Sequence, residues 1–145
     1  MRHLRDLLAG RPIDVPVYDY ASYTRTGATE RLDPAPFVVI EGLLVLYWKD
    51  LRDLCRTTVY VDAADELCLE RRKRRDVVER QRTVESVTRQ YNETVRPMAE
   101  QYVWPTKAFA GLIVSGTAPL ERCAEEVLLH ISRTSQAQAP TATMR

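Results

Sequence analysis

The sequence predicts an α/β layer fold built around a parallel sheet, and three observations support this prediction. Residues 37–40 and 57–62 form continuous β-branched runs, which are typical of strands buried on both faces. Segments of helical composition separate and follow these runs, an alternation that favours helices layered on a sheet. The chain has 145 residues, of which 45% are hydrophobic and 28% charged, so it suits one domain with a sizeable core.

The N-terminal part predicts a helix followed by a hairpin. Residues 1–9 carry Leu4, Leu7 and Leu8 on one helical face, and Gly10 is a plausible helix stop. Residues 13–33 contain prolines, extended stretches and a Thr-Gly turn signal, so we expect a small β-hairpin excursion there.

The remaining elements follow in alternation. The strand at 37–40 is introduced by two prolines, and a short helix is expected at 49–55 before the strand at 57–62. Two helices are expected next, at 63–80 and 83–99, the second with an apolar face of valines and Tyr91. A third strand at 112–114 and a closing helix at 119–131 complete the domain, and 132–145 is expected to be a disordered tail.

Composition excludes several classes of protein. No apolar run approaches the roughly 20 residues of a membrane span, and no secretory signal is visible. The three cysteines are widely spaced and odd in number, which favours buried free thiols and a cytoplasmic protein over a disulfide framework or a zinc site. The net charge of +1 gives no indication of nucleic-acid or membrane binding.

The glycine count is restrictive. The chain has five glycines, none followed by lysine, and contains neither a G-x-x-x-x-G-K-[ST] phosphate loop nor a G-x-G-x-x-G motif. Taken alone, this argues against an enzyme that uses a nucleoside triphosphate.

Glu41 is the first candidate site residue. It directly follows the run at 37–40, so it is expected at the carboxyl edge of the parallel sheet, where open α/β folds bind ligands. In nucleotide-binding folds a carboxylate there commonly holds magnesium. The alternative is a structural role in capping the next turn or pairing with a neighbouring base.

The second candidate is a basic segment. Residues 71–82 hold seven basic residues against two acidic ones, spread over the end of one helix and the start of the next. Guanidinium groups match phosphate oxygens, and a lid that carries them also excludes water during phosphoryl transfer. The alternative is a solvated helix whose charges pair with acidic neighbours.

The third candidate is the aromatic segment with Tyr18 and Tyr23, whose rings can stack on a base. An ordinary amphipathic strand is the alternative. Gln90 is a weaker candidate, because an amide can read a base edge but a glutamine on a helix surface needs no function.

These segments occur in an order that resembles the uridine kinase (uridine/cytidine kinase) family. The resemblance covers roughly residues 1–131. It rests on residues 15–20, 22–25, 38–44, 51–54, 59–62, 71–72, 75–76, 79–82, 90–91, 95–98 and 105–107.

The resemblance implies a P-loop kinase-like three-layer fold, N-terminally incomplete, with an Arg-rich helical lid. It implies transfer of the γ-phosphate of ATP (or GTP), with Mg²⁺, to the 5'-hydroxyl of uridine or cytidine in pyrimidine salvage. By resemblance, the site residues have three roles. The residues expected to bind the nucleoside are Tyr18, Tyr23, Arg72, Arg82 and Gln90. Those expected to approach the phosphates are Arg75, which is also the expected catalytic residue, and Arg80. Magnesium is expected to be bound by Glu41.

Three departures from the family pattern matter. Tyr23 stands where the family usually has a histidine that contacts the pyrimidine, and Gln81 stands where it has a glycine between two arginines. The family's first strand, phosphate loop and catalytic aspartate have no counterpart in the sequence, so the 145 residues are expected to be inactive as a kinase by themselves.

Two alternatives remain open. One is a related phosphotransferase of the phosphoribulokinase and uridine kinase superfamily with another substrate. The other is a degenerate, non-catalytic nucleoside-binding protein. Only the resemblance indicates a homo-oligomer.

Overall fold

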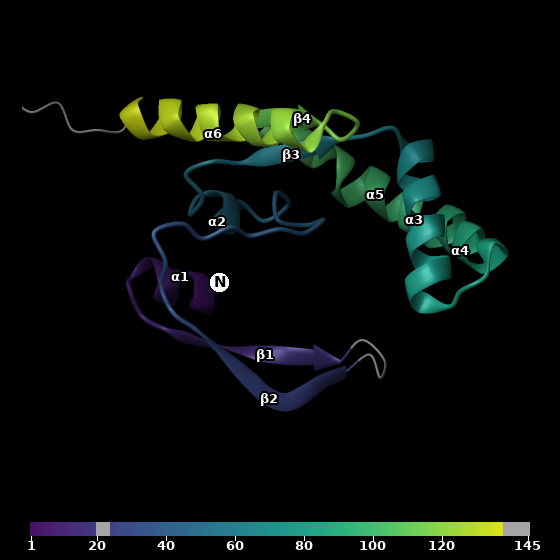
Figure 1. Cartoon of the computed structure of the whole chain (residues 1–145), viewed down its shortest axis with the longest axis horizontal. Helices are drawn as coiled ribbons and strands as arrows, with labels where there is room; N and C mark the ends of the chain where they lie inside the picture. Colours follow the sequence, from purple (N-terminus) through teal and green to yellow (C-terminus); the bar gives the residue numbers. More distant parts are fainter. Residues whose placement is uncertain (20–23, 138–145) are drawn as a thin grey trace, which may run out of the picture. The chain divides into compact units, whose positions relative to one another are not determined.

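The computed structural model describes residues 1–19 and 24–137, which belong to two compact units divided between Glu41 and Gly42 (Figure 1). The first unit contains a short helix and a hairpin, and the second contains a parallel sheet with helices. The predicted α/β class is therefore confirmed. The two units are described separately below.

The first unit begins with α1 (Arg2–Leu8), which ends where the sequence predicts. Gly10 has φ +74°, and Arg11 N–H donates to the Asp6 carbonyl at 2.8 Å while Gly10 N–H donates to that of Leu7 at 3.0 Å. These two bonds around a left-handed glycine form a Schellman motif, which satisfies carbonyls at the helix end.

The predicted hairpin is confirmed as two antiparallel strands, β1 (Ile13–Asp19) and β2 (Thr24–Leu32). Their register runs from Ile13 opposite Leu32 to Asp19 opposite Thr24, with a shift after Pro16. Proline has no N–H to donate to a strand partner, so an irregularity at that position is expected.

The predicted strand at 37–40 is wrong. These residues have no regular secondary structure, and the side chains of Phe37 and Val39 are 75% and 89% exposed. A buried strand needs backbone hydrogen bonds to a neighbouring strand as well as apolar side chains, and no described segment pairs with this one. Glu41 therefore does not follow a sheet strand, contrary to the expectation.

The second unit is organised by β3 (Val59–Asp62) and β4 (Leu112–Ser115), which pair in parallel with Asp62 opposite Ser115. Helix α6 (Leu120–Ala137) packs on β4. It extends six residues past the predicted end at Ile131, so the expected tail is helical as far as Ala137.

The crossover between the two strands is helical. It contains α3 (Asp65–Arg80), α4 (Val84–Gln90), a π-helical turn η1 (Tyr91–Val95), α5 (Arg96–Tyr102) and the 3-10 helix η2 (Trp104–Phe109). The short helix before β3 is α2 (Lys49–Arg52).

The helix predicted at 83–99 is thus interrupted by a π turn. The physical reason is Pro97, which lacks an N–H and whose ring clashes with the carbonyl four residues earlier. A local wide turn accommodates that clash without ending the helical path.

The core of the helical crossover lies between α3 and α4. Val87 is fully buried and Tyr91 is 5% exposed, as expected from the apolar face, whereas Val84 is half exposed. The Tyr91 hydroxyl donates to the Asp65 carboxylate at the start of α3. Burial and this acceptor both raise the pKa of the Tyr91 phenol, because each favours its protonated form.

Candidate functional site

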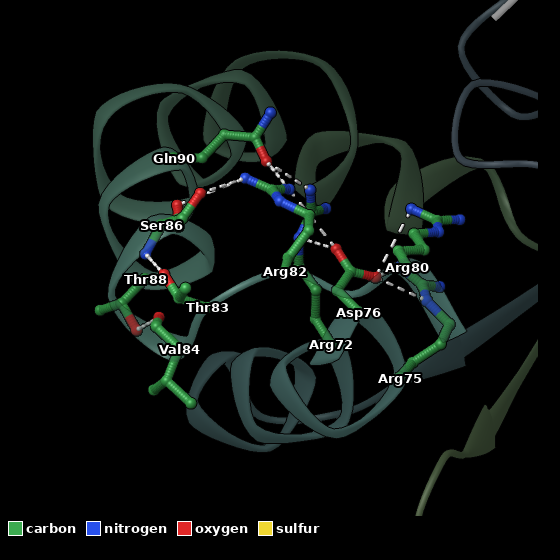
Figure 2. A network of polar contacts seen from close by, with 10 residues as sticks. All are labelled: Arg72, Arg75, Asp76, Arg80, Arg82, Thr83, Val84, Ser86, Thr88 and Gln90. Carbon is green, nitrogen blue, oxygen red and sulfur yellow. Dashed lines mark hydrogen bonds and ion pairs between the residues drawn. The ribbon is translucent and has the colours of Figure 1, made fainter. Parts of the chain in front are cut away.

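The segment formed by α3, α4 and the turn between them contains a cluster of arginines around one buried carboxylate (Figure 2). Asp76 lies in the last part of α3 and has no exposed surface. Its ion-pair partners are all arginines. They are Arg72, Arg75, Arg80 and Arg82.

The turn between α3 and α4 brings residues from both sides of it to Asp76. Gln81 ends α3 in the left-handed conformation, with φ +52° and ψ +34°. The Arg82 N–H then donates to the Asp76 carbonyl at 3.1 Å. Thr83 caps α4, because its hydroxyl accepts from the Ser86 N–H at 3.2 Å. The chain reversal places Arg80 and Arg82, on either side of Gln81, beside the same carboxylate.

The two carboxylate oxygens of Asp76 have different partners. Oδ1 lies 2.9 Å from Arg75 Nη2 and 3.5 Å from Arg80 Nη1, and it also accepts a hydrogen bond from Arg75 Nε. Oδ2 lies 3.5 Å from Arg72 Nε and 3.7 Å from Arg82 Nη1. The division coincides with the predicted roles, since Arg75 and Arg80 are the expected phosphate residues and the others the expected nucleoside residues.

Gln90 joins the two arginines on the Oδ2 side. Its Oε1 accepts from Arg72 Nη2 at 3.0 Å and from Arg82 Nη1 at 2.6 Å. Arg82 also donates to the Ser86 hydroxyl at 3.0 Å. The structure therefore brings the predicted residues Arg72, Arg82 and Gln90 together, and Figure 2 shows the three side chains converging beside Asp76.

The cluster carries an excess of positive charge. Four guanidinium groups face one carboxylate, and Glu79, the other acid of the segment, is exposed. Arg75 and Arg80 have side chains that are 45% exposed, while those of Arg72 and Arg82 are 22% and 26% exposed. The cluster can thus bind an anion through its outer pair, with a polar, better shielded pair beside it.

The solvated-helix alternative explains only part of the basic segment. Lys73 pairs with Glu70 at 2.8 Å, one turn away on α3. Arg71 Nη2 donates to the Gly116 carbonyl at 2.8 Å, which ties α3 to the loop after β4. These two residues have local structural roles, whereas the four around Asp76 form the candidate site.

Of the other predicted site residues, two belong to the first unit and one lies outside the described residues. Tyr18 lies on β1 opposite Arg25 and is 43% exposed. Glu41 is exposed at the end of the first unit, and Tyr23 lies outside the described residues. Among residues 1–19 and 24–137, no group of three or more His, Cys, Asp or Glu side chains could hold a metal.

The central residue of the cluster, Asp76, was not among the predicted site residues. A signal was available, because Arg72 and Arg80 stand four residues before and after it and must share its helix face. The contributions of Arg75 and Arg82 depend on side-chain direction and on the turn at Gln81, which no periodicity indicates.

A second polar group lies at the carboxyl end of β3. Lys107 Nζ pairs with Asp62 Oδ2 at 2.7 Å, and the Gly116 N–H donates to the Asp62 carbonyl at 2.7 Å. Gly116 approaches so closely that a Cβ would lie 3.0 Å from that carbonyl oxygen. Burial and then the Asp62 charge raise the pKa of nearby Tyr60, and Lys107 opposes them.

The cysteines and helices test two exclusions made from composition. Cys55, Cys68 and Cys123 are free thiols, as predicted, but none is fully buried: Cys55 and Cys123 are partly exposed and Cys68 is exposed. Within the part of the chain that the structure describes, no helix is long and apolar enough to cross a membrane.

Comparison with known proteins identifies the family. The profile of the Phosphoribulokinase / Uridine kinase family matches residues 1–119. A uridine kinase of Streptococcus thermophilus strain LMD-9 is 42% identical over 114 residues, which cover 79% of this chain and 54% of the relative. A uridine kinase of Streptococcus pyogenes serotype M5 is 42% identical over 114 residues, covering 79% and 55%. The chain spans about half the length of these relatives, and it belongs to the phosphoribulokinase and uridine kinase family.

Proposed function

We propose that the chain is the acceptor-binding and lid part of a nucleoside kinase of the uridine kinase type. The reaction transfers the γ-phosphate of ATP (or GTP) to the 5'-hydroxyl of uridine or cytidine, in pyrimidine salvage in the cytoplasm. The observation that carries the proposal is the arginine cluster. It places the three lid residues expected to bind the nucleoside in mutual contact, directly beside the two arginines expected to approach the phosphates.

The chemistry of the cluster suits this reaction. Phosphoryl transfer needs little covalent participation from the protein and depends on positioning and charge stabilisation. Arg75 and Arg80 keep their charge at any working pH and have exposed surface with which to bind phosphate oxygens. Arg72 and Arg82 direct N–H groups toward one side of Gln90, whose amide N–H₂ is a donor for the edge of a base or a sugar hydroxyl.

The remaining roles extend the proposal beyond the lid. Tyr18 and Tyr23 would contact the nucleoside from the hairpin, and Glu41 would bind Mg²⁺ together with phosphate oxygens, as a single carboxylate can. Magnesium would neutralise charge on the transferred phosphate. Because the 145 residues contain no glycine-rich phosphate loop, we expect the polypeptide they form to bind acceptor without transferring phosphate by itself.

Calorimetric titration of the 145-residue chain with uridine and cytidine tests the proposal. We expect binding of at least one nucleoside, and Gln90→Ala should raise its dissociation constant about tenfold. A tenfold change is about 1.4 kcal/mol, which is the net worth of about one hydrogen bond from the Gln90 amide to the nucleoside.

Gln101→Ala is the matched control, because Gln101 is an exposed glutamine on the neighbouring helix α5. It should leave nucleoside binding unchanged. Equal affinities in the wild type and Gln90→Ala would contradict the assigned pocket. UMP formation from uridine and Mg-ATP by this polypeptide, above a blank and lost in Arg75→Ala, would contradict the expectation of inactivity.

The same titration separates the alternatives. Binding of a sugar phosphate in preference to either nucleoside would favour a related phosphotransferase with another acceptor. The other alternative is a non-catalytic nucleoside-binding protein. Such a binding protein predicts that Mg-ATP and its analogues do not change the affinity for uridine. A kinase lid predicts instead that the arginine cluster binds inorganic triphosphate in addition to the nucleoside bound by the chain.

A further inference from the structure

We propose that Asp76 is a positioning residue that sets the geometry of both arginine pairs and joins the acceptor side of the lid to its phosphate side. The proposal rests on the function proposed above. It adds to that function a residue that does not itself meet substrate, because Asp76 is fully buried beneath the arginines that would.

The first support is the division of the carboxylate. Oδ1 contacts Arg75 and Arg80, and Oδ2 contacts Arg72 and Arg82, so each oxygen serves one predicted half of the site. The two oxygens of one carboxylate are rigidly connected. A displacement of either arginine pair that rotates the carboxylate therefore changes the position available to the other pair.

The second support is the way in which Asp76 is held. Its carbonyl accepts the Arg82 N–H at 3.1 Å, so the residue is tied to the α3–α4 turn through its main chain as well as its side chain. The other groups that face the arginines are neutral and come from α4. They are the Gln90 amide and the Ser86 hydroxyl and carbonyl. In the described chain, Asp76 is therefore the carboxylate that balances these four charges.

The third support concerns the Oδ2 side. Asp76 Oδ2 and Arg72 Nε are both buried, and neither has a hydrogen-bond partner. At 3.5 and 3.7 Å, Arg72 and Arg82 are held to Oδ2 by charge, while the directional hydrogen bonds come from Gln90. Removing the charge should release these arginines even if the shape of the side chain is kept.

These observations give a test in which positioning and simple electrostatics predict opposite signs. Asp76→Asn removes one negative charge from the cluster. If Asp76 only neutralised charge, the variant would bind an anion more tightly, because the net positive charge increases. If Asp76 positions the arginines, the variant binds the anion more weakly despite that added charge, since dispersed guanidiniums no longer converge on one ligand.

The experiment is calorimetric titration of the 145-residue chain with inorganic triphosphate at fixed ionic strength. We expect Asp76→Asn to weaken triphosphate binding fivefold or more. Glu79→Gln is the matched control, because it removes the same charge from an exposed residue of the same helix. The control should bind triphosphate as tightly as the wild type or up to twofold more tightly. Equal or tighter binding by Asp76→Asn would overturn the proposal.

Asp76→Glu provides a second variant that keeps the charge. The added methylene shifts the carboxylate, so positioning predicts several-fold weaker triphosphate binding. A role in charge balance alone predicts no change, and that result would also overturn the proposal. This variant decides the question even if Asp76→Asn does not fold.

A measurement without ligand separates failure of this proposal from failure of the proposed function. In ¹⁵N spectra of the arginine side chains, Arg72, Arg75, Arg80 and Arg82 should give dispersed Nε–H signals in the wild type. In Asp76→Glu or Asp76→Asn these should shift toward the position of free arginine, with the helix content unchanged by circular dichroism. Unshifted signals would refute the positioning role. Dispersed wild-type signals without any triphosphate or nucleoside binding would instead refute the proposed function.

Discussion

The left-handed residue at the end of α3 gives a prediction whose magnitude follows from the backbone. Gln81 has φ +52°, a conformation that costs a residue with a Cβ about 1–2 kcal/mol and costs glycine almost nothing. Glycine also loses about 0.5–1 kcal/mol more conformational entropy on folding. Gln81→Gly should therefore stabilise the turn by a net of about 0.5–1 kcal/mol.

The reporter is the Arg82 amide, whose hydrogen bond to the Asp76 carbonyl at 3.1 Å closes this turn. A gain of about 0.5–1 kcal/mol should slow its hydrogen exchange about two- to fivefold. Exchange is measured by heteronuclear NMR in the wild type and in the variant, at the same pH and temperature.

Gly10 offers a control of opposite sign. It has φ +74° at the end of α1, and a Cβ added there would have no atom within 4 Å. Gly10→Ala should therefore carry only the backbone cost and speed exchange of the Arg11 amide, bonded to the Asp6 carbonyl at 2.8 Å, about two- to fivefold. If Gly10→Ala behaves so while Gln81→Gly leaves the Arg82 amide unchanged or less protected, the reasoning about Gln81 is refuted.

Two further predictions concern phenols whose pKa the fold raises. The folded chain holds the Tyr91 phenolic proton more tightly than the unfolded chain does. The protonated phenol therefore contributes fully to the free energy of unfolding below pH 10, and this contribution is lost as the pH rises further. The urea midpoint should thus fall between pH 9 and pH 11 more in the wild type than in Tyr91→Phe, and equal falls would contradict this. Lys107→Met should raise the pKa of Tyr60 further, because it removes the charge that opposes Asp62. Absorbance titration at 295 nm measures the pKa, and Tyr60→Phe assigns the signal to Tyr60. A Tyr60 pKa that falls or stays the same in Lys107→Met would contradict the prediction.

Several parts of the fold that the sequence predicted correctly depend on contacts near in the chain, although the predicted strands β3 and β4 pair with each other over a long separation. The α1 stop at Gly10, the hairpin and the apolar face through Val87 and Tyr91 each involve neighbours within one or two turns or one hairpin. The strand at 37–40 failed because strand formation depends on a distant partner, which a local run of β-branched residues does not reveal. The π turn was missed for a different reason, since the helix at 83–99 was predicted from its composition and apolar face, without an account of Pro97.

The candidate site also combines features that local sequence reveals with features that depend on the folded chain. The residue types in the lid indicated phosphate chemistry, and the resemblance assigned a role to each arginine. Asp76 was not predicted as a site residue because an acidic residue among seven basic ones indicates an ordinary ion pair on a helix surface. Its burial depends on the turn at Gln81, which returns Arg82 to the face that already holds Arg72. Tyr18 and Glu41 belong to the first compact unit, so local sequence patterns could not predict whether they lie near the arginine cluster of the second unit.

The arginine cluster is also the part of the candidate site that residues near one another in the chain can assemble. Every contact of the arginine cluster described above lies within residues 72–90, and α4, which contains the fully buried Val87, packs against α3. A cluster made from local contacts has a low entropic cost of closure and can keep its geometry when distant segments move. That property suits the proposed role as a lid, because a lid has to bring preformed charge to a reaction site. The opposite holds for residues 37–40 and Glu41, because the sheet edge that the sequence predicted for them needs a partner strand, and no described segment pairs with residues 37–40.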